Sequence, residues 1–133
     1  MRAVLDPNVV ISGLLSRDGS PAAVLLAWQE GRVEVLISRH LLRELERALG
    51  YPKLRARVSQ PDAQAALEWL SQGATIVGDP DEEPPVRSED PGDDYLIALA
   101  AVERAVLVSG DKHLLALADR IPVYSPREFM DLV

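Results

Sequence analysis

The stretch Arg2-Ala-Val-Leu-Asp-Pro-Asn-Val-Val-Ile-Ser-Gly13 decides the fold of this chain. Its apolar run, Ala3 to Leu5, has the pattern of a short strand that is buried on both faces of a parallel sheet. The strand must stop at Asp6, because Pro7 has no N–H to donate to a sheet ladder. Open α/β sheets bind their ligands at the carboxyl ends of their strands, so Asp6 is a candidate functional residue.

Length and composition predict one globular domain over residues 1–133. The chain has no cysteine and only two histidines, which excludes disulfides, zinc–thiolate sites, thiol nucleophiles and multi-histidine metal sites. A metal ion would therefore be held by oxygen ligands, which favours Mg²⁺ or Mn²⁺. The sequence has neither a signal-peptide pattern nor an apolar run of about 20 residues, so we expect a cytoplasmic protein with no membrane partner.

The net charge of −7 is concentrated in one segment. Residues 79–94 contain eight acids and one base, so the remainder of the chain is neutral. Residues 39–57 instead carry six bases against two acids. Because the local field governs contact with a polyanion, these bases are candidates for binding one. They are Arg39, Arg43, Arg47, Lys53, Arg55 and Arg57.

Apolar periodicity predicts strands that alternate with helices along the chain. Strands are expected at residues 3–5, 33–37, 74–77, 105–108 and 122–124. Helices are expected at residues 7–15, 22–30, 38–49, 61–72, 90–102, 114–118 and 126–132, with a short turn at 53–58. Residues 78–91 hold four prolines and six acids, which indicates an irregular surface loop. The alternation predicts a three-layer α/β/α sandwich around a central parallel sheet of four to five strands.

Four acids are placed near the carboxyl edge of this sheet. Asp6 and Asp111 each follow an apolar strand directly, and they would converge if those strands were neighbours. Asp93 and Asp94 fall in the first turn of a helix that begins at the same edge, where Asp93 could complete a capping box. Like charges gathered in one pocket repel unless a cation neutralises them, so such a cluster favours a divalent ion and phosphodiester hydrolysis.

A fifth acid could come from the helix at 38–49. Glu44 lies beside the apolar stripe of this helix, and Glu46 on the other flank fits the periodicity equally well. Each acid also has a purely structural interpretation. Asp6 and Asp111 could cap helices, Asp93 and Asp94 could serve the helix dipole, and Glu44 could form a solvated ion pair.

The order of four motifs resembles that of the PIN domain, and within it the VapC-like toxin components of toxin–antitoxin systems. The motifs are Val-Leu-Asp6-Pro-Asn8-Val, Ser38-Arg-His-Leu-Leu-Arg-Glu44-Leu, Asp90-Pro-Gly-Asp-Asp94-Tyr-Leu-Ile-Ala-Leu-Ala and Val-Ser-Gly-Asp111-Lys-His-Leu-Leu. The resemblance covers essentially the whole chain.

The resemblance implies a Mg²⁺- or Mn²⁺-dependent endoribonuclease that hydrolyses RNA and is the toxin of a toxin–antitoxin pair. The resemblance assigns the acid of the 38–49 helix to Glu44 rather than Glu46. The implied catalytic acids are Asp6, Glu44, Asp94 and Asp111. The implied metal ligands are Asp6, Asp94 and Asp111, with Asp93 and Glu44 as further candidates and Asp90 as an extra acid of this branch. Asn8 and Ser109 match supporting polar positions. RNA, a cognate antitoxin and a second copy of the chain in a homodimer are the implied partners.

One residue departs from the family pattern. Family members commonly have Thr or Ser where this chain has Pro7, which removes a hydroxyl and an N–H beside Asp6. Two other interpretations remain open. One is a non-catalytic PIN-like scaffold that binds RNA or protein. The other is a receiver-like phosphoacceptor, which would need a second early acid and a differently placed lysine.

Overall fold

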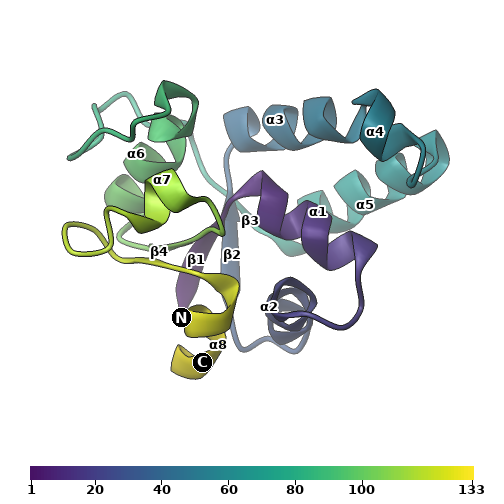
Figure 1. Ribbon diagram of the computed structural model, residues 1–133, viewed down its shortest axis with the longest axis horizontal. Helices are drawn as coiled ribbons and strands as arrows, with labels where there is room; N and C mark the ends of the chain where they lie inside the picture. The colour runs from purple at the N-terminus through teal and green to yellow at the C-terminus, as the bar shows by residue number, and fades with distance from the viewer.

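The computed structural model describes residues 1–133 and contains a five-stranded sheet covered by helices (Figure 1). The strands are β1 (Arg2–Leu5), β2 (Glu34–Ile37), β3 (Thr75–Ile76), β4 (Val106–Val108) and β5 (Val123–Tyr124). The helices are α1 (Pro7–Leu15), α2 (Ser20–Gln29), α3 (Arg39–Leu49), α4 (Pro52–Arg55), α5 (Gln60–Gly73), α6 (Asp94–Glu103), α7 (Lys112–Leu115) and α8 (Pro126–Leu132). A 3₁₀ turn, η1 (Pro91–Asp93), precedes α6.

All five strands are parallel and lie in the order β3-β2-β1-β4-β5. The central strand β1 pairs with both neighbours, so that Ala3 lies opposite Val35 of β2 and Val106 of β4. The chain runs outward on one side through β2 and β3 and on the other through β4 and β5. The strand order therefore reverses between β1 and β4, the point at which open α/β sheets bind ligands. This pairing confirms the prediction that the strands before Asp6 and Asp111 are neighbours in the sheet.

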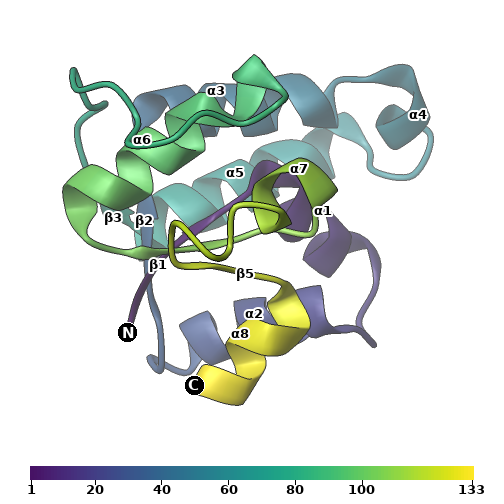
Figure 2. The same ribbon diagram turned by 60° about the vertical axis from the view of Figure 1, so that its left-hand side comes forward.

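The helices form a layer on each side of the sheet, which confirms the predicted three-layer sandwich. Figure 1 shows α1, α2, α3 and α5 on one side of β1 and β2, and α6 and α7 on the other; in Figure 2, α6 lies in front and α3 and α5 lie behind. Helix α3 buries Leu41, Leu45 and Leu49, each at most 1% exposed. Burial of each such side chain contributes about 1.5–3 kcal/mol, which fixes the orientation of α3 about its own axis. The flank carrying Glu44 and Arg47 is thereby held toward the carboxyl edge of the sheet.

The start of α6 differs from the prediction. The expected helix began at residue 90 with Asp93 in a capping box. Instead, the Asp90 carboxylate accepts a hydrogen bond from the Gly92 N–H (3.0 Å) and closes the η1 turn. The side chain of Asp93 makes no capping hydrogen bond, so the capping-box prediction is wrong. Asp93 is left free for another role.

The acidic loop is irregular, as predicted, and it is tied to α3. Residues 77–90 contain no helix or strand. The Asp79 carboxylate accepts a hydrogen bond from the His40 N–H (3.1 Å) in the first turn of α3. No single helix has the length and hydropathy to cross a membrane; α1 and α2 would do so only as a pair, bent by 96°.

The packing of α1 on α2 leads to a prediction about Gly13. A Cβ atom at this position would lie 2.6 Å from Leu25 Cδ1 and 2.9 Å from the Pro21 carbonyl oxygen. Gly13→Ala should therefore lower the free energy of unfolding by about 1–3 kcal/mol despite the higher helix propensity of alanine. Urea unfolding measures this change. Gly78→Ala is the matched control, because its Cβ would meet nothing within 4 Å. Wild-type stability for Gly13→Ala would contradict the close α1–α2 contact.

Candidate active site

Two acids leave the carboxyl ends of the neighbouring strands β1 and β4. The Asp6 N–H donates to the carbonyl oxygen of Val108 (2.9 Å), which extends the β1–β4 pairing by one bond. Asp6 also caps α1, since its Oδ1 accepts from the Asn8 N–H (3.0 Å). Asp111 caps α7 in the same way by accepting from the His113 N–H (2.7 Å). The capping interpretation is thus correct for both acids, and it holds their carboxylates at the strand-order reversal.

Ser109 connects the two acids. Its side chain is completely buried, and its hydroxyl donates to Asp6 Oδ2 (2.7 Å) while accepting from the Asp111 N–H (3.0 Å). Burial raises the pKa of Asp6. The hydrogen bonds from Asn8 and Ser109 act against this rise, and the nearby Asp111 carboxylate adds to it. The site therefore holds Asp6 in place while disfavouring its negative charge.

Asp93 is the third acid at this point. Burial is the largest cause that raises its pKa to about 7, and the Asp111, Asp90 and Asp6 carboxylates add to the effect. Its Oδ2 atom is buried and has no hydrogen-bond partner. A buried carboxylate oxygen without a partner is costly, and a bound cation would relieve that cost.

Asp94 is turned away from this cluster, so its predicted role as catalytic residue and metal ligand is not supported by its placement. Its Oδ1 accepts from the Ser88 N–H (2.8 Å), and its Oδ2 lies 3.4 Å from Arg87 Nη1. Consecutive residues at a helix start point in different directions, and here Asp93 lines the cavity beside Asp6 whereas Asp94 does not. The sequence had offered Asp93 as a further candidate, and the structure favours it.

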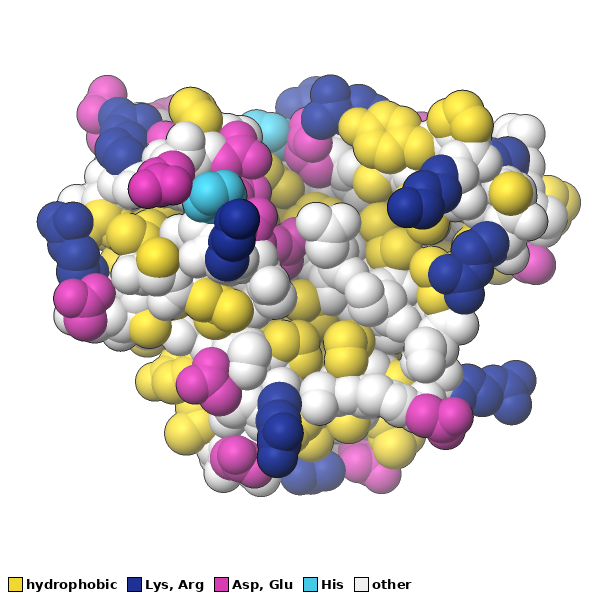
Figure 3. Space-filling view, viewed as in Figure 1, with side chains coloured by type: hydrophobic (Ala, Val, Ile, Leu, Met, Phe, Trp, Pro, Cys, Tyr) yellow, Lys and Arg dark blue, Asp and Glu magenta, His cyan; other side chains and the backbone are white.

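The acids border a cavity of about 400 Å³ on the face seen in Figure 3, where acidic side chains lie in a hollow. The polar and aromatic lining residues are Asp6, Asn8, Glu44, Arg47, Tyr51, Asp90, Asp93 and Tyr95. A second cavity of about 300 Å³ adjoins it at Asn8 and is bordered by Asp111. The acids thus stand between two hollows at one edge of the sheet.

Glu44, and not Glu46, belongs to this cavity. Glu44 Oε2 lies 2.6 Å from Arg47 Nη2, and its Oε1 lies 3.8 Å from His40 Nε2. The His40 ring stacks on Tyr95 with a centroid distance of 4.0 Å. Glu46 instead lines a groove between α3 and α5. Glu44 therefore combines a place in the cavity with the ion pair that its structural interpretation predicted.

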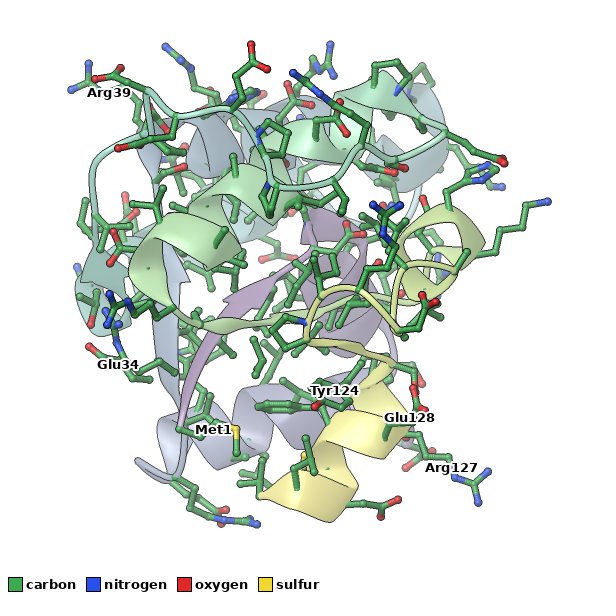
Figure 4. The ribbon with its side chains drawn as sticks, turned by 90° about the vertical axis from the view of Figure 1, so that its left-hand side faces the viewer. Met1, Glu34, Arg39, Tyr124, Arg127 and Glu128 are labelled. Carbon is green, nitrogen blue, oxygen red and sulfur yellow. The ribbon has the colours of Figure 1, made fainter.

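The six predicted RNA-binding bases are all exposed, but they do not share one place. Arg47 lines the acidic cavity, and Arg39 extends into solvent at the far end of α3 (Figure 4). Lys53 and Arg55 lie on α4, close to the cavity rim formed by Tyr51. Sequence reasoning did not identify Tyr51, Tyr95 or the special place of Arg47, because their proximity to Asp6 depends on how α3 packs.

The oxygen atoms at this site are of the chemical type that binds a divalent ion. Oxygen ligands of Asp6, Asp93 and Asp111 are those that Mg²⁺ and Mn²⁺ prefer, and Asp93 Oδ2 lacks a partner. As the side chains stand, no three Asp, Glu or His residues come together closely enough to coordinate one ion. The chemistry of the residues fits a metal, although their present positions do not form a complete coordination shell.

Comparison with known proteins agrees with the fold. Residues 2–113 match the sequence profile of the PIN domain, and the chain belongs to this family. An uncharacterised protein of Methanocaldococcus jannaschii, MJ1680, is 26% identical over 98% of this chain and 90% of its own length. PIN domains are in general nucleases and typically depend on divalent metals.

Two solved structures share the fold. PAE2754 from Pyrobaculum aerophilum has a TM-score of 0.65 at 18% identity, covering 99% of this chain and 94% of its own. VapBC2 from Rickettsia felis, bound to a DNA fragment from its promoter, has a TM-score of 0.59 at 17% identity, covering 94% of this chain and 98% of that one. The predicted PIN domain is thereby confirmed, and the chain shares its fold with VapBC2.

The raised pKa of Asp93 predicts how stability depends on pH in metal-free protein. The ordinary pKa is 3.8 and the folded value is about 7, so between these values the folded protein holds a proton that the unfolded chain releases. The contribution of Asp93 to the free energy of unfolding should therefore fall as pH rises from about 4 to about 7. Asp93→Asn should remove this fall and raise the melting temperature progressively over the same range.

Thermal unfolding in EDTA at a series of pH values measures this difference. Asp119→Asn, at an exposed position, is the control for loss of a surface carboxylate. If the difference between Asp93→Asn and wild type is the same at every pH, the proposed environment of Asp93 is wrong.

Proposed function

We propose that this chain is a Mg²⁺- or Mn²⁺-dependent endoribonuclease that hydrolyses phosphodiester bonds of RNA. The observation that carries the proposal is the buried, unpartnered Oδ2 of Asp93 beside Asp6 and Asp111 at the reversal of strand order. The Asp111 carboxylate raises the pKa of both Asp6 and Asp93, and this repulsion is difficult to explain as structure alone, because neutral residues could cap the helices in place of Asp6 and Asp111. A divalent ion would compensate this repulsion.

Each residue of the site has a role in the proposed reaction. Asp6, Asp93 and Asp111 would hold the metal ion, which when bound would activate a water and offset the charge on the phosphate. Ser109 and the Asn8 N–H keep the Asp6 carboxylate in one orientation.

On the other wall of the cavity, the Arg47 guanidinium is placed to contact a phosphate group, for which its planar geometry is suited. Glu44, held by Arg47, would orient the attacking water or complete the acidic set.

We further propose that the chain is the toxin of a toxin–antitoxin pair and acts as a single-domain protein in the cytoplasm. The shared fold with VapBC2, which is solved on promoter DNA, supports an antitoxin partner. The proposal that the chain forms a homodimer rests on the family relation. A non-catalytic scaffold is the alternative, and the incomplete metal shell is the observation that favours it.

Metal binding distinguishes an enzyme from a scaffold. Mn²⁺ at about 100 times its Kd should add about 2.7 kcal/mol to the free energy of unfolding. For a chain of this size the melting temperature should rise by roughly 10 °C. Asp93→Asn should lose most of this rise, whereas Asp119→Asn should keep it. Differential scanning fluorimetry at constant ionic strength measures the effect, and no rise in the wild type would favour the scaffold.

Activity should discriminate between the two adjacent acids. Asp6→Asn and Asp93→Asn should each lower metal-dependent RNA cleavage by about 100-fold or more, because a charged group at the reacting centre is lost. Asp94→Asn should cleave within a few fold of wild type, since an asparagine oxygen can still accept from the Ser88 N–H.

A gel assay on a defined single-stranded RNA, with and without EDTA, measures all three variants. Each must first show a wild-type circular dichroism spectrum. Full activity of Asp6→Asn would refute the mechanism, and equal losses in Asp93→Asn and Asp94→Asn would refute the assignment of Asp93.

A further inference from the structure

One aromatic ring in this chain is exposed to solvent, and it borders the acidic cavity. Tyr51 is 50% exposed, and no other large aromatic side chain is exposed. The other five are half-buried or buried: Trp28, Trp69, Tyr95, Tyr124 and Phe129. Since a solvated ring gives no core stabilisation, the exposure of Tyr51 calls for a role outside the core.

The remaining rings are unavailable for a ligand at this site. Trp28 and Trp69 pack edge to face at 4.7 Å, and Tyr95 is stacked on His40. Tyr124 lies beside α8, far from Arg39 and the start of α3 (Figure 4). Tyr51 alone has a ring with no aromatic partner next to the carboxylates.

The backbone holds Tyr51 firmly at the junction of α3 and α4. Its N–H donates to the Ala48 carbonyl oxygen (3.2 Å), and its own carbonyl oxygen accepts from the N–H groups of Leu54 (3.0 Å) and Arg55 (2.8 Å). The following Pro52 restricts Tyr51 to an extended conformation, observed at φ −64° and ψ 142°. The ring therefore extends from a fixed support, which lowers the entropy lost when a ligand packs on it.

Basic residues lie close to Tyr51 along the chain. Arg47 lines the same cavity, and Lys53 and Arg55 follow on α4. Figure 3 shows exposed hydrophobic side chains flanked by Lys and Arg side chains over α3 and α4. An aromatic ring set among cations is the combination that binds single-stranded nucleic acid, in which bases stack on rings while cations contact phosphates.

We propose that Tyr51 stacks on an unpaired base of single-stranded RNA and so places the neighbouring phosphate at Asp6 and Asp93. The inference rests on the proposed ribonuclease function and adds the residue that orients the strand. Bases inside a duplex already stack on one another and cannot cover the ring, so Tyr51 selects single strands over duplexes. Every base has a flat face, so the contact itself is tolerant of sequence.

Equilibrium binding tests the inference apart from cleavage. All binding measurements use protein that carries Asp6→Asn. In the proposed mechanism this substitution prevents cleavage, and it also removes one negative charge that would repel RNA. Into this background are placed Tyr51→Ala, the ring-preserving Tyr51→Phe, and Leu26→Ala as a control of matched exposure (53%) on α2. Fluorescence anisotropy at fixed salt measures the Kd for a labelled ten-nucleotide RNA, the same sequence as DNA, and the RNA annealed to its complement.

Tyr51→Ala should weaken binding of the single-stranded RNA about 5- to 150-fold, the effect of losing one stacked base. Tyr51→Phe and Leu26→Ala should stay within about twofold of the background, and binding of the duplex should not change. Equal losses for single-stranded RNA and DNA place the contact on the base, as proposed. In wild-type protein, the Tyr51→Ala change should raise KM for RNA more than it lowers kcat.

Three results would overturn the inference: no single-stranded binding by the background protein, unchanged binding by Tyr51→Ala, or equal losses in Tyr51→Ala and Tyr51→Phe. Unchanged binding would exclude base stacking as the role of the exposed ring. The proposed ribonuclease function fails on a different measurement, namely if wild-type protein does not cleave RNA. The comparison of Kd values between the variants would still decide the role of Tyr51.

Discussion

The buried hydroxyl of Ser109 is the contact on which the site depends. It donates to Asp6 and accepts from the Asp111 backbone, so it joins the ends of two neighbouring strands by side chain as well as by sheet pairing. The Asp6 N–H adds a bond to Val108 at the same level. Two negative groups are therefore held together by polar contacts that water cannot replace, since Ser109 is completely buried.

The buried carboxylates destabilise the folded chain at the same point where they would serve the proposed reaction. Burial, with a contribution from the Asp111 carboxylate, raises the pKa values of Asp6 and Asp93, which means that the folded chain resists their ionisation. Hydrophobic packing elsewhere, above all the buried stripe of α3, must offset this cost. Titratable groups perturbed in this way gather at functional sites more often than elsewhere. The fold is thus strained where the chain contacts its proposed substrate and well packed where it does not.

Much of the fold could be predicted from the sequence, because apolar runs and their ends are local signals. The ends of β1 and β4 located Asp6 and Asp111, and the parallel order followed from alternating elements. The choice between Asp93 and Asp94 could not be made in this way. Both acids occupy one helix start, and the direction of Asp94 is set by the Ser88 N–H in the preceding irregular loop, a contact that periodicity does not predict. The exposure of Tyr51 likewise depends on how α3 and α4 meet.

Pro7 is explained by its place in the first turn of α1. Asp6 is the N-cap, so Pro7 occupies the first helical position, where a backbone N–H would have no partner within the helix. The ring also restricts the unfolded chain, which has fewer conformations to lose on folding; such a proline commonly adds about 0.4–1 kcal/mol. The residue that departs from the family pattern therefore lowers the entropic cost of ordering the turn in which Asp6 must be held.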